Sequence, residues 1–164
     1  MNTLNIIAFT MYTILLALHS GFRWFVLTSI LFTLFNAYKG WWFHKKYTAF
    51  DNYTRHATAT LAHIQLALGI SLYFISPVID YFIKNFREAI HQRELRFFGL
   101  EHSSMMLLAI LILTIGSIKA KRKSTDKEKF KTIALWFSLS LFILLTSIPW
   151  AFSPLVSRPN FRLF

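Results

Sequence analysis

The sequence contains no cysteine and few charged residues. Without cysteine, the chain has no disulfide, no thiolate metal site, no iron–sulfur ligation and no covalent attachment of haem through a thioether. Charged residues make up 15% of the 164 residues, whereas a typical soluble domain has about 25%. Apolar residues make up 55%, in four long runs that no compact core of this size could bury. The composition therefore predicts a membrane protein.

Familiar catalytic motifs are also missing. The sequence has no HExxH, no GxSxG and no phosphate-binding loop. Glu101 is the single carboxylate inside the apolar runs, whereas a hydrolytic metal site needs a carboxylate beside clustered histidines. Whether the chain is an enzyme is left open, and an electron-transfer protein is favoured over a stand-alone enzyme.

The apolar runs predict an all-α, integral membrane four-helix bundle that forms a single transmembrane domain over residues 1–164. The expected helices cover about 4–38, 53–79, 95–118 and 130–152, each long enough to cross a bilayer. The first run lacks the basic start of a signal peptide, so we expect it to be retained. Ser76 and Pro77 mark the end of the second helix, and Pro149 lies in the last turns of the fourth.

Basic residues predict the orientation. They are denser in the first and third connections, KGWWFHKKYTAFDNYTR and KAKRKSTDKEKFK, than in the second connection and the tail. Because such loops face the cytoplasm, we expect both termini on the periplasmic side of a bacterial inner membrane. Lipid headgroups then account for the net charge of +11, and nucleic acid is not an expected partner. The second connection predicts a short amphipathic helix on the outer surface.

Ionisable residues inside membrane spans are costly and are candidate functional residues. The first span contains His19 and Arg23, the second contains His63, and the third contains Glu101 and His102. Counting from the centres of the connections places His19 and His102 at similar depth in the outer half of the membrane, beside Tyr73 and Phe74. His63 is expected on the order of 15 Å deeper, at 1.5 Å per residue.

Two histidines at one depth on separate helices predict a haem held from both faces. We favour His19 with His102 as the axial pair. His63 is the alternative ligand, a proton carrier or a quinone-site residue. Arg23 is a candidate partner for a haem propionate or a quinone oxygen. Other interpretations stay open: the histidines could simply bond neighbouring helices, and Arg23 could pair with Glu101.

Several motifs together resemble a known family. LHSGFRW, AHIQLALGISLYFISP, LRFFGLEHSSMM, SIKAKRK and SIPWAF are similar to those of short four-helix membrane proteins, frequent in Bacteroidetes, that are catalogued as cytochrome b-like. The resemblance covers about His19 to Phe152. It implies haem b and a respiratory type of electron transfer, with His19, Arg23, His63, Glu101 and His102 at the motif positions.

The resulting expectation is a b-type cytochrome that exchanges electrons with the quinone pool or a respiratory complex. A homodimer and a subunit of a larger complex are both open. The alternatives are a haem-free accessory or assembly subunit and a small metal-handling protein that uses His63 and Met105 for copper. The tail 153–164 extends beyond the family pattern, and its role is open.

Overall fold

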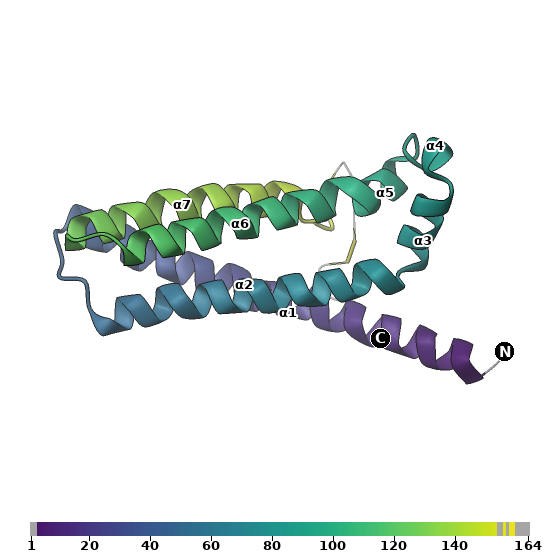
Figure 1. Cartoon of the computed structure of the whole chain (residues 1–164), viewed down its shortest axis with the longest axis horizontal. Coiled ribbons are helices and arrows are strands. Elements are labelled where there is room, and N and C mark those ends of the chain that lie inside the picture. Colours follow the sequence, from purple (N-terminus) through teal and green to yellow (C-terminus); the bar gives the residue numbers. More distant parts are fainter. Residues whose placement is uncertain (1–2, 154–155, 157, 160–164) are drawn as a thin grey trace.

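The chain folds into four long helices and several short ones, described here from a computed structural model (Figure 1). The structure describes residues 3–153, 156, 158 and 159. In chain order the helices are α1 (Thr3–Trp42), α2 (Ala49–Ile75), α3 (Pro77–Lys84), α4 (Phe86–Ala89), α5 (Arg93–Arg96), the π-helical turn η1 (Phe97–Glu101), α6 (His102–Lys121) and α7 (Asp126–Ser147). No strand occurs within these described ranges, so the all-α prediction is confirmed.

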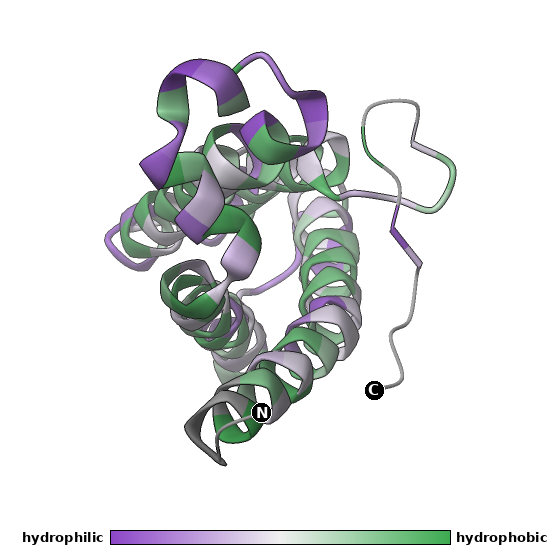
Figure 2. Ribbon diagram, turned by 90° about the vertical axis from the view of Figure 1, so that its right-hand side faces the viewer, coloured by the Kyte–Doolittle hydropathy of each residue, from purple (hydrophilic) through white to green (hydrophobic). Residues whose placement is uncertain are grey.

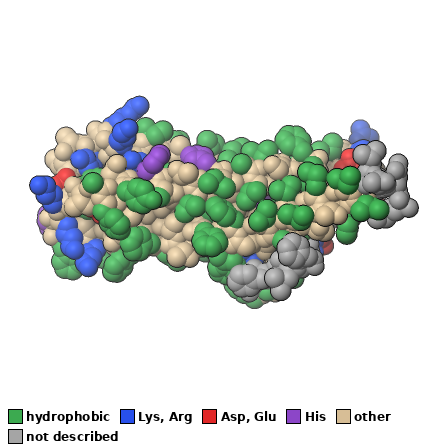
Figure 3. Space-filling view, turned by 90° about the horizontal axis from the view of Figure 1, so that it is seen from below, with side chains coloured by type: hydrophobic (Ala, Val, Ile, Leu, Met, Phe, Trp, Pro, Cys, Tyr) green, Lys and Arg blue, Asp and Glu red, His purple; other side chains and the backbone are tan. Residues whose placement is uncertain are grey.

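The four long helices form a bundle in which each lies beside two others. α1 packs against α2 and α7, and α6 packs against the same two helices. Fully buried Ile30, Leu113 and Phe137 lie in the core between them. Large apolar side chains also cover the outside along the length of the bundle (Figure 3), where Phe25 is 66% exposed and Phe74 is 83% exposed.

This exposed apolar surface requires an apolar solvent. Four helices are long and apolar enough to cross a membrane, namely 9–42 within α1, α2, the continuous helix 93–121 and α7. In a bilayer the hydrophobic effect does not drive helices together, so close packing and interhelical hydrogen bonds hold them. Thr33 bonds Thr58 across α1 and α2 at 2.9 Å, and Ser140 donates to the Ala109 carbonyl at 2.8 Å. The chain is thus built as a multi-pass membrane protein.

The helix ends follow local sequence signals. α2 begins with a capping box, in which the Thr48 hydroxyl accepts from the Asp51 backbone while the Asp51 carboxylate accepts from the Thr48 backbone. α2 ends at Ile75 rather than near residue 79, because Pro77 keeps Ser76 extended, and the break falls at the Ser76 and Pro77 pair that the sequence marks. α7 ends at Ser147 rather than near residue 152, because Pro149 keeps the preceding residue extended. Trp150 and Phe152 therefore lie outside the helix and stack on each other.

The second connection is not one amphipathic helix but a series of short ones. α3 starts at Pro77, and the helical path breaks at Asn85, whose φ of −120° and ψ of 38° are not helical. A further break at residues 90–92 separates α4 from α5. Figure 2 shows the hydrophilic residues of this segment gathered at the end of the bundle that faces the viewer. The segment folds across that end and contributes buried Ile79 and Phe82.

Candidate functional site between α1, α2 and α6

Two of the three candidate histidines lie together. His19 on α1 and His102 at the start of α6 have ring centroids 6.5 Å apart, with the ring planes at 80°. Within the described residues, no hydrogen bond joins the two rings. The expected proximity of His19 and His102 is therefore confirmed, while their ligand role stays a prediction.

The His102 ring is held by α7. Its Nδ1 lies 2.8 Å from the carbonyl oxygen of Ser147, the last residue of α7. Since a carbonyl only accepts hydrogen bonds, Nδ1 carries the proton and Nε2 keeps its lone pair. A backbone carbonyl on one ring nitrogen is the usual way to orient a histidine that binds a metal through the other. Phe97 and Phe98 flank the ring, with centroids 5.7 and 6.3 Å away.

The π-helical turn η1 sets the position of His102. A π-turn adds a residue to the helical repeat, shifts the side chains around the axis and is often found at functional sites. The Tyr73 hydroxyl of α2 donates to the Gly99 carbonyl within this turn at 2.9 Å. Gly99 also allows close packing, because a Cβ there would lie 2.4 Å from Phe82 Cδ1. Tyr73 and Phe82 thus hold the turn from two sides.

The His19 ring lies against α2. A Cβ added at Gly69 would come within 3.2 Å of His19 Cε1, so the glycine leaves space for the ring. The Gln65 side-chain amide donates to the His19 carbonyl at 2.9 Å and ties the two helices at this level. His19 Nδ1 is buried and has no hydrogen-bond partner among the described residues. A buried polar atom in that state is expected to have a ligand or an ordered water.

Both histidines line one cavity of about 650 Å³ between α1, α2 and α6. Its volume lies within the range of about 300–1,000 Å³ typical of cofactor sites. Its wall is largely apolar, with Leu16, Leu66 and Ile110 among the lining residues, and Tyr73 and Phe74 border it as expected. Arg23 also lines it, one turn from His19 on α1. The cavity thus combines an apolar wall, two imidazoles and a cation.

The tail brings a second cation to the cavity. Arg158 and Pro159 line it, and the Pro159 carbonyl accepts a hydrogen bond from Arg23 Nη2 at 3.4 Å. The Arg158 guanidinium pairs with Glu94 and lies 5.1 Å from the centre of the Phe98 ring. The sequence indicated none of this, because a basic residue after the last span is usually only an interfacial anchor. Most of the tail 153–164 lies outside the described residues.

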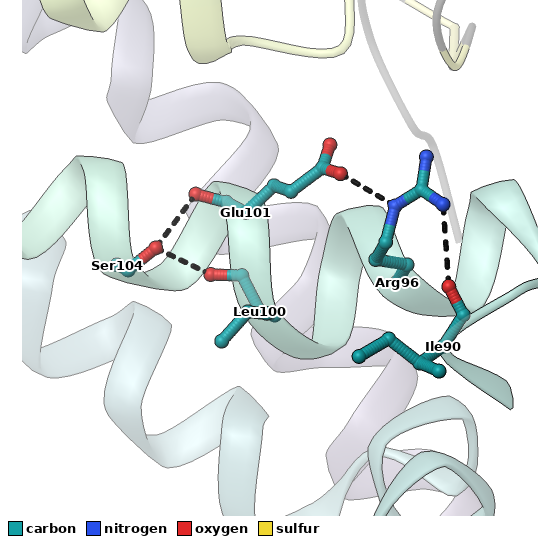
Figure 4. Close-up of polar contacts among 5 residues, drawn as sticks. All are labelled: Ile90, Arg96, Leu100, Glu101 and Ser104. Atoms are coloured by element: carbon teal, nitrogen blue, oxygen red, sulfur yellow. Dashed lines mark hydrogen bonds and ion pairs between the residues drawn. The ribbon is translucent and has the colours of Figure 1, made fainter. Parts of the chain in front are cut away.

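Glu101 is oriented differently from the sequence expectation. Its carboxylate forms an ion pair of 2.7 Å with Arg96, and Arg96 also donates to the Ile90 carbonyl (Figure 4). The Glu101 side chain is 45% exposed and is not among the residues that line the cavity. The suggested pair between Arg23 and Glu101 is therefore not observed. Within one turn, adjacent residues point about 100° apart, which separates Glu101 from His102.

His63 does not join the other two histidines. Its Nε2 bonds the Thr114 hydroxyl at 3.0 Å, and it lies in a separate groove between α2 and α6 together with His56. The sequence correctly indicated a different depth for His63, but its role as an alternative ligand receives no support from this placement. Gln65, Gly69 and Ser147 were missed by sequence reasoning, because a single small or neutral residue in a span carries no distinctive signal.

Among the described residues that line the cavity, His19 and His102 are the two with an imidazole that could bind a metal. Within the described part of the chain, no group of three or more histidine, cysteine, aspartate or glutamate residues could hold an ion. A zinc site normally needs three or four protein ligands, whereas a haem brings four nitrogens of its own and needs only axial ligands from the protein. The chain matches no family model, no curated protein and no solved structure. The site must therefore be interpreted from its own geometry.

Proposed function

We propose that this chain is a membrane b-type haem protein, with His19 and His102 as the axial ligands. The main support is that the two imidazole rings, with centroids 6.5 Å apart, line one cavity of about 650 Å³. Two metal–nitrogen bonds of about 2 Å each, together with the two ring radii, span a distance close to this separation. Haem b bound there would accept and release one electron at a time.

The surrounding residues fit such a group. The Ser147 carbonyl keeps the proton of His102 on Nδ1, so that Nε2 is available as a ligand. The Nδ1 atom of His19 is buried and has no hydrogen-bond partner among the described residues. Gly69 leaves space for the His19 ring beside α2. The largely apolar wall of the cavity suits a flat hydrophobic ring system, which gains free energy when its apolar surface leaves water.

Arg23 and Arg158 are the residues proposed to bind the propionates. Both line the cavity, Arg23 from the middle of α1 and Arg158 from the tail. A guanidinium can bind a carboxylate through two parallel hydrogen bonds. The two arginines would therefore hold the acidic groups of a haem at the wall of the cavity.

We further propose that electrons pass between this site and the quinone pool or another membrane complex in a bacterial inner membrane, with both termini in the periplasm. The support is the membrane fold, the redox group proposed for it and the greater number of basic residues in the first and third connections. A quinone, a homodimer and a larger complex remain the candidate partners in this proposal.

The test is the absorption spectrum of the full-length protein purified from cells supplied with haem. We expect a sharp α band and a Soret shift in the reduced-minus-oxidised spectrum. His19→Ala and His102→Ala should each remove these bands, while His63→Ala, the matched control in a span, should retain them. A featureless wild-type spectrum would refute the haem assignment. Loss of the bands in His63→Ala alone would instead identify a different ligand set.

A further inference from the structure

A second groove lies at the opposite end of the bundle and does not depend on the haem proposal. It has a volume of about 620 Å³ and runs between the first turns of α2 and the last turns of α6. This is the end at which the connections 43–48 and 122–125 carry their lysines, seen as the blue side chains at the left of Figure 3. The groove therefore opens where the spans meet one face of the membrane.

The groove is strongly cationic. Its lining includes Arg55 from α2 together with Lys121 and Arg122 from the end of α6. His56 and His63 add two more nitrogen ligands or donors, and no carboxylate is among the described residues that line it. Three cationic side chains with no acid among the described lining residues create a local field that favours an anion.

Arg55 is the strongest evidence for a bound anion, because its side chain is buried and bonds only neutral groups. The residue is 5% exposed. Its Nη1 donates to the Ser117 carbonyl at 3.1 Å and to the Ser117 hydroxyl, and its Nη2 donates to Asn52 Oδ1 at 2.9 Å. Its Nε is buried without a hydrogen-bond partner among the described residues. A buried guanidinium that bonds only neutral oxygens is costly unless an anion completes its shell.

The groove also has an apolar part. Ala59 on α2 and Ile118 on α6 lie in its wall, and Ile118 is 47% exposed on the outside of the bundle. A ligand here would meet cations at the membrane boundary and apolar side chains further in. This change from cationic to apolar surroundings matches a lipid, in which a phosphate group is followed by acyl chains. Basic pockets between spans are known to select anionic lipid headgroups in this way.

We infer that the groove between α2 and α6 binds the phosphate of an anionic phospholipid, with Arg55, Lys121 and Arg122 as the cationic contacts. The Thr60 hydroxyl lines the same groove, but its proton is donated to the His56 carbonyl at 3.1 Å, so the cationic side chains supply the donors for the headgroup. A free phosphate ion has the same anionic chemistry but would leave the apolar wall without a partner. The lipid is therefore the source to which the proposal commits.

The experiment measures lipid retained on the full chain by native mass spectrometry after exchange into mixtures of phosphatidylglycerol and phosphatidylcholine. The test variant Lys121→Gln with Arg122→Gln removes two exposed charges from the groove. The control, Lys45→Gln with Lys46→Gln, removes two exposed charges from the same end of the bundle but outside the groove. At the strength expected for two lysine or arginine contacts near a membrane surface, the test variant should bind phosphatidylglycerol about thirtyfold more weakly. The control should change by less than about threefold, because only the bulk field is altered.

Equal losses in the two double variants would overturn the inference, since they would show that the whole basic end attracts lipid without a site. Equal retention of phosphatidylcholine and phosphatidylglycerol by the wild type would overturn it as well. In a separate arm, inorganic phosphate that displaces the lipid and stays bound would identify a soluble anion instead. Arg55→Gln should also lose the lipid; its melting temperature is measured alongside, because a buried residue is replaced.

Discussion

Arg23 and Glu101 are two charged residues that look alike in the sequence but whose side chains lie in different places in the folded chain. Both occur inside apolar runs, and a charge in a span is a functional candidate in either case. The structure places Arg23 on the cavity wall and turns Glu101 towards Arg96. A half-exposed ion pair of this kind contributes little to stability.

Replacing these two residues separates their roles. Arg23→Gln should weaken haem binding about tenfold or more, because a hydrogen bond to a charged group contributes about 1.5–3 kcal/mol. Glu101→Gln should leave the spectrum unchanged and cost no more than about 1 kcal/mol of stability. Haem titration of the two apoproteins, followed by absorbance, measures the two affinities, and thermal unfolding measures the loss of stability in Glu101→Gln. A larger loss in Glu101→Gln than in Arg23→Gln would contradict this assignment.

At the scale of secondary-structure elements, the π-turn η1 is the feature that the sequence did not predict. An apolar run of this length is compatible with a continuous α-helix, and the extra residue of a π-turn leaves the hydropathy pattern nearly unchanged. The turn is stabilised by contacts from outside it, through the Tyr73 hydroxyl and the Phe82 ring. Its position is therefore a property of the packed helices.

Tyr73→Phe tests this support. The change removes the donor to the Gly99 carbonyl and should reduce stability by about 1 kcal/mol, because a part-buried acceptor loses its partner. It should also alter the surroundings of the His102 ring, because His102 lies three residues after Gly99 in the chain. Tyr53→Phe is the matched control, since Tyr53 is 68% exposed. Thermal unfolding in detergent measures the difference, and identical melting of the two variants would argue against the proposed support.

The contact between α6 and α7 depends on a glycine. A Cβ at Gly116 would lie 2.2 Å from Trp136 Cβ, which belongs to the base of its side chain and cannot rotate away. Gly116→Ala should therefore push the helices apart and destabilise the bundle by about 1–3 kcal/mol. Gly21→Ala has nothing within 4 Å of the added carbon and should be neutral or stabilising by up to about 1 kcal/mol. Comparing the two melting temperatures decides between a packing effect and a general effect of alanine.

At the scale of the whole molecule, the two ends of the bundle differ in chemistry. The end with α3–α5 and the tail holds the two-histidine cavity, whereas the other end holds the cationic groove. The distribution of lysine and arginine places the groove end in the cytoplasm in our proposal. The proposed haem would then lie nearer the periplasmic surface.

Because the sequence has no cysteine, the orientation of the bundle in the membrane can be measured with single introduced cysteines. Single variants Lys46→Cys and Lys127→Cys should react with a membrane-impermeant maleimide only after the cells are opened, because the proposed orientation puts the end of the bundle that carries them in the cytoplasm. Arg87→Cys, in the exposed segment between α3 and α5, should react in intact spheroplasts. The wild type, which has no thiol, is the background control. The reverse labelling pattern would invert the topology while leaving the fold intact.

The sequence by itself determined the four spans and the approximate depths of the histidines. Both follow from length and composition, because a hydrocarbon solvent demands about 20 apolar residues per helix and a helix rises by a constant amount per residue. It could not determine which way each side chain faces around its helix axis. That rotation is set by contacts between helices, such as Gly69 against His19 and the Ser147 carbonyl against His102.

Only the tertiary structure therefore turned Glu101 away from the cavity and brought Arg158 to it. The sequence alone also could not show that Arg55 is buried beside a groove, since its position near the start of α2 is typical of a solvated interfacial residue. These outcomes depend on packing between segments distant in the chain, for which hydropathy and spacing contain no direct signal.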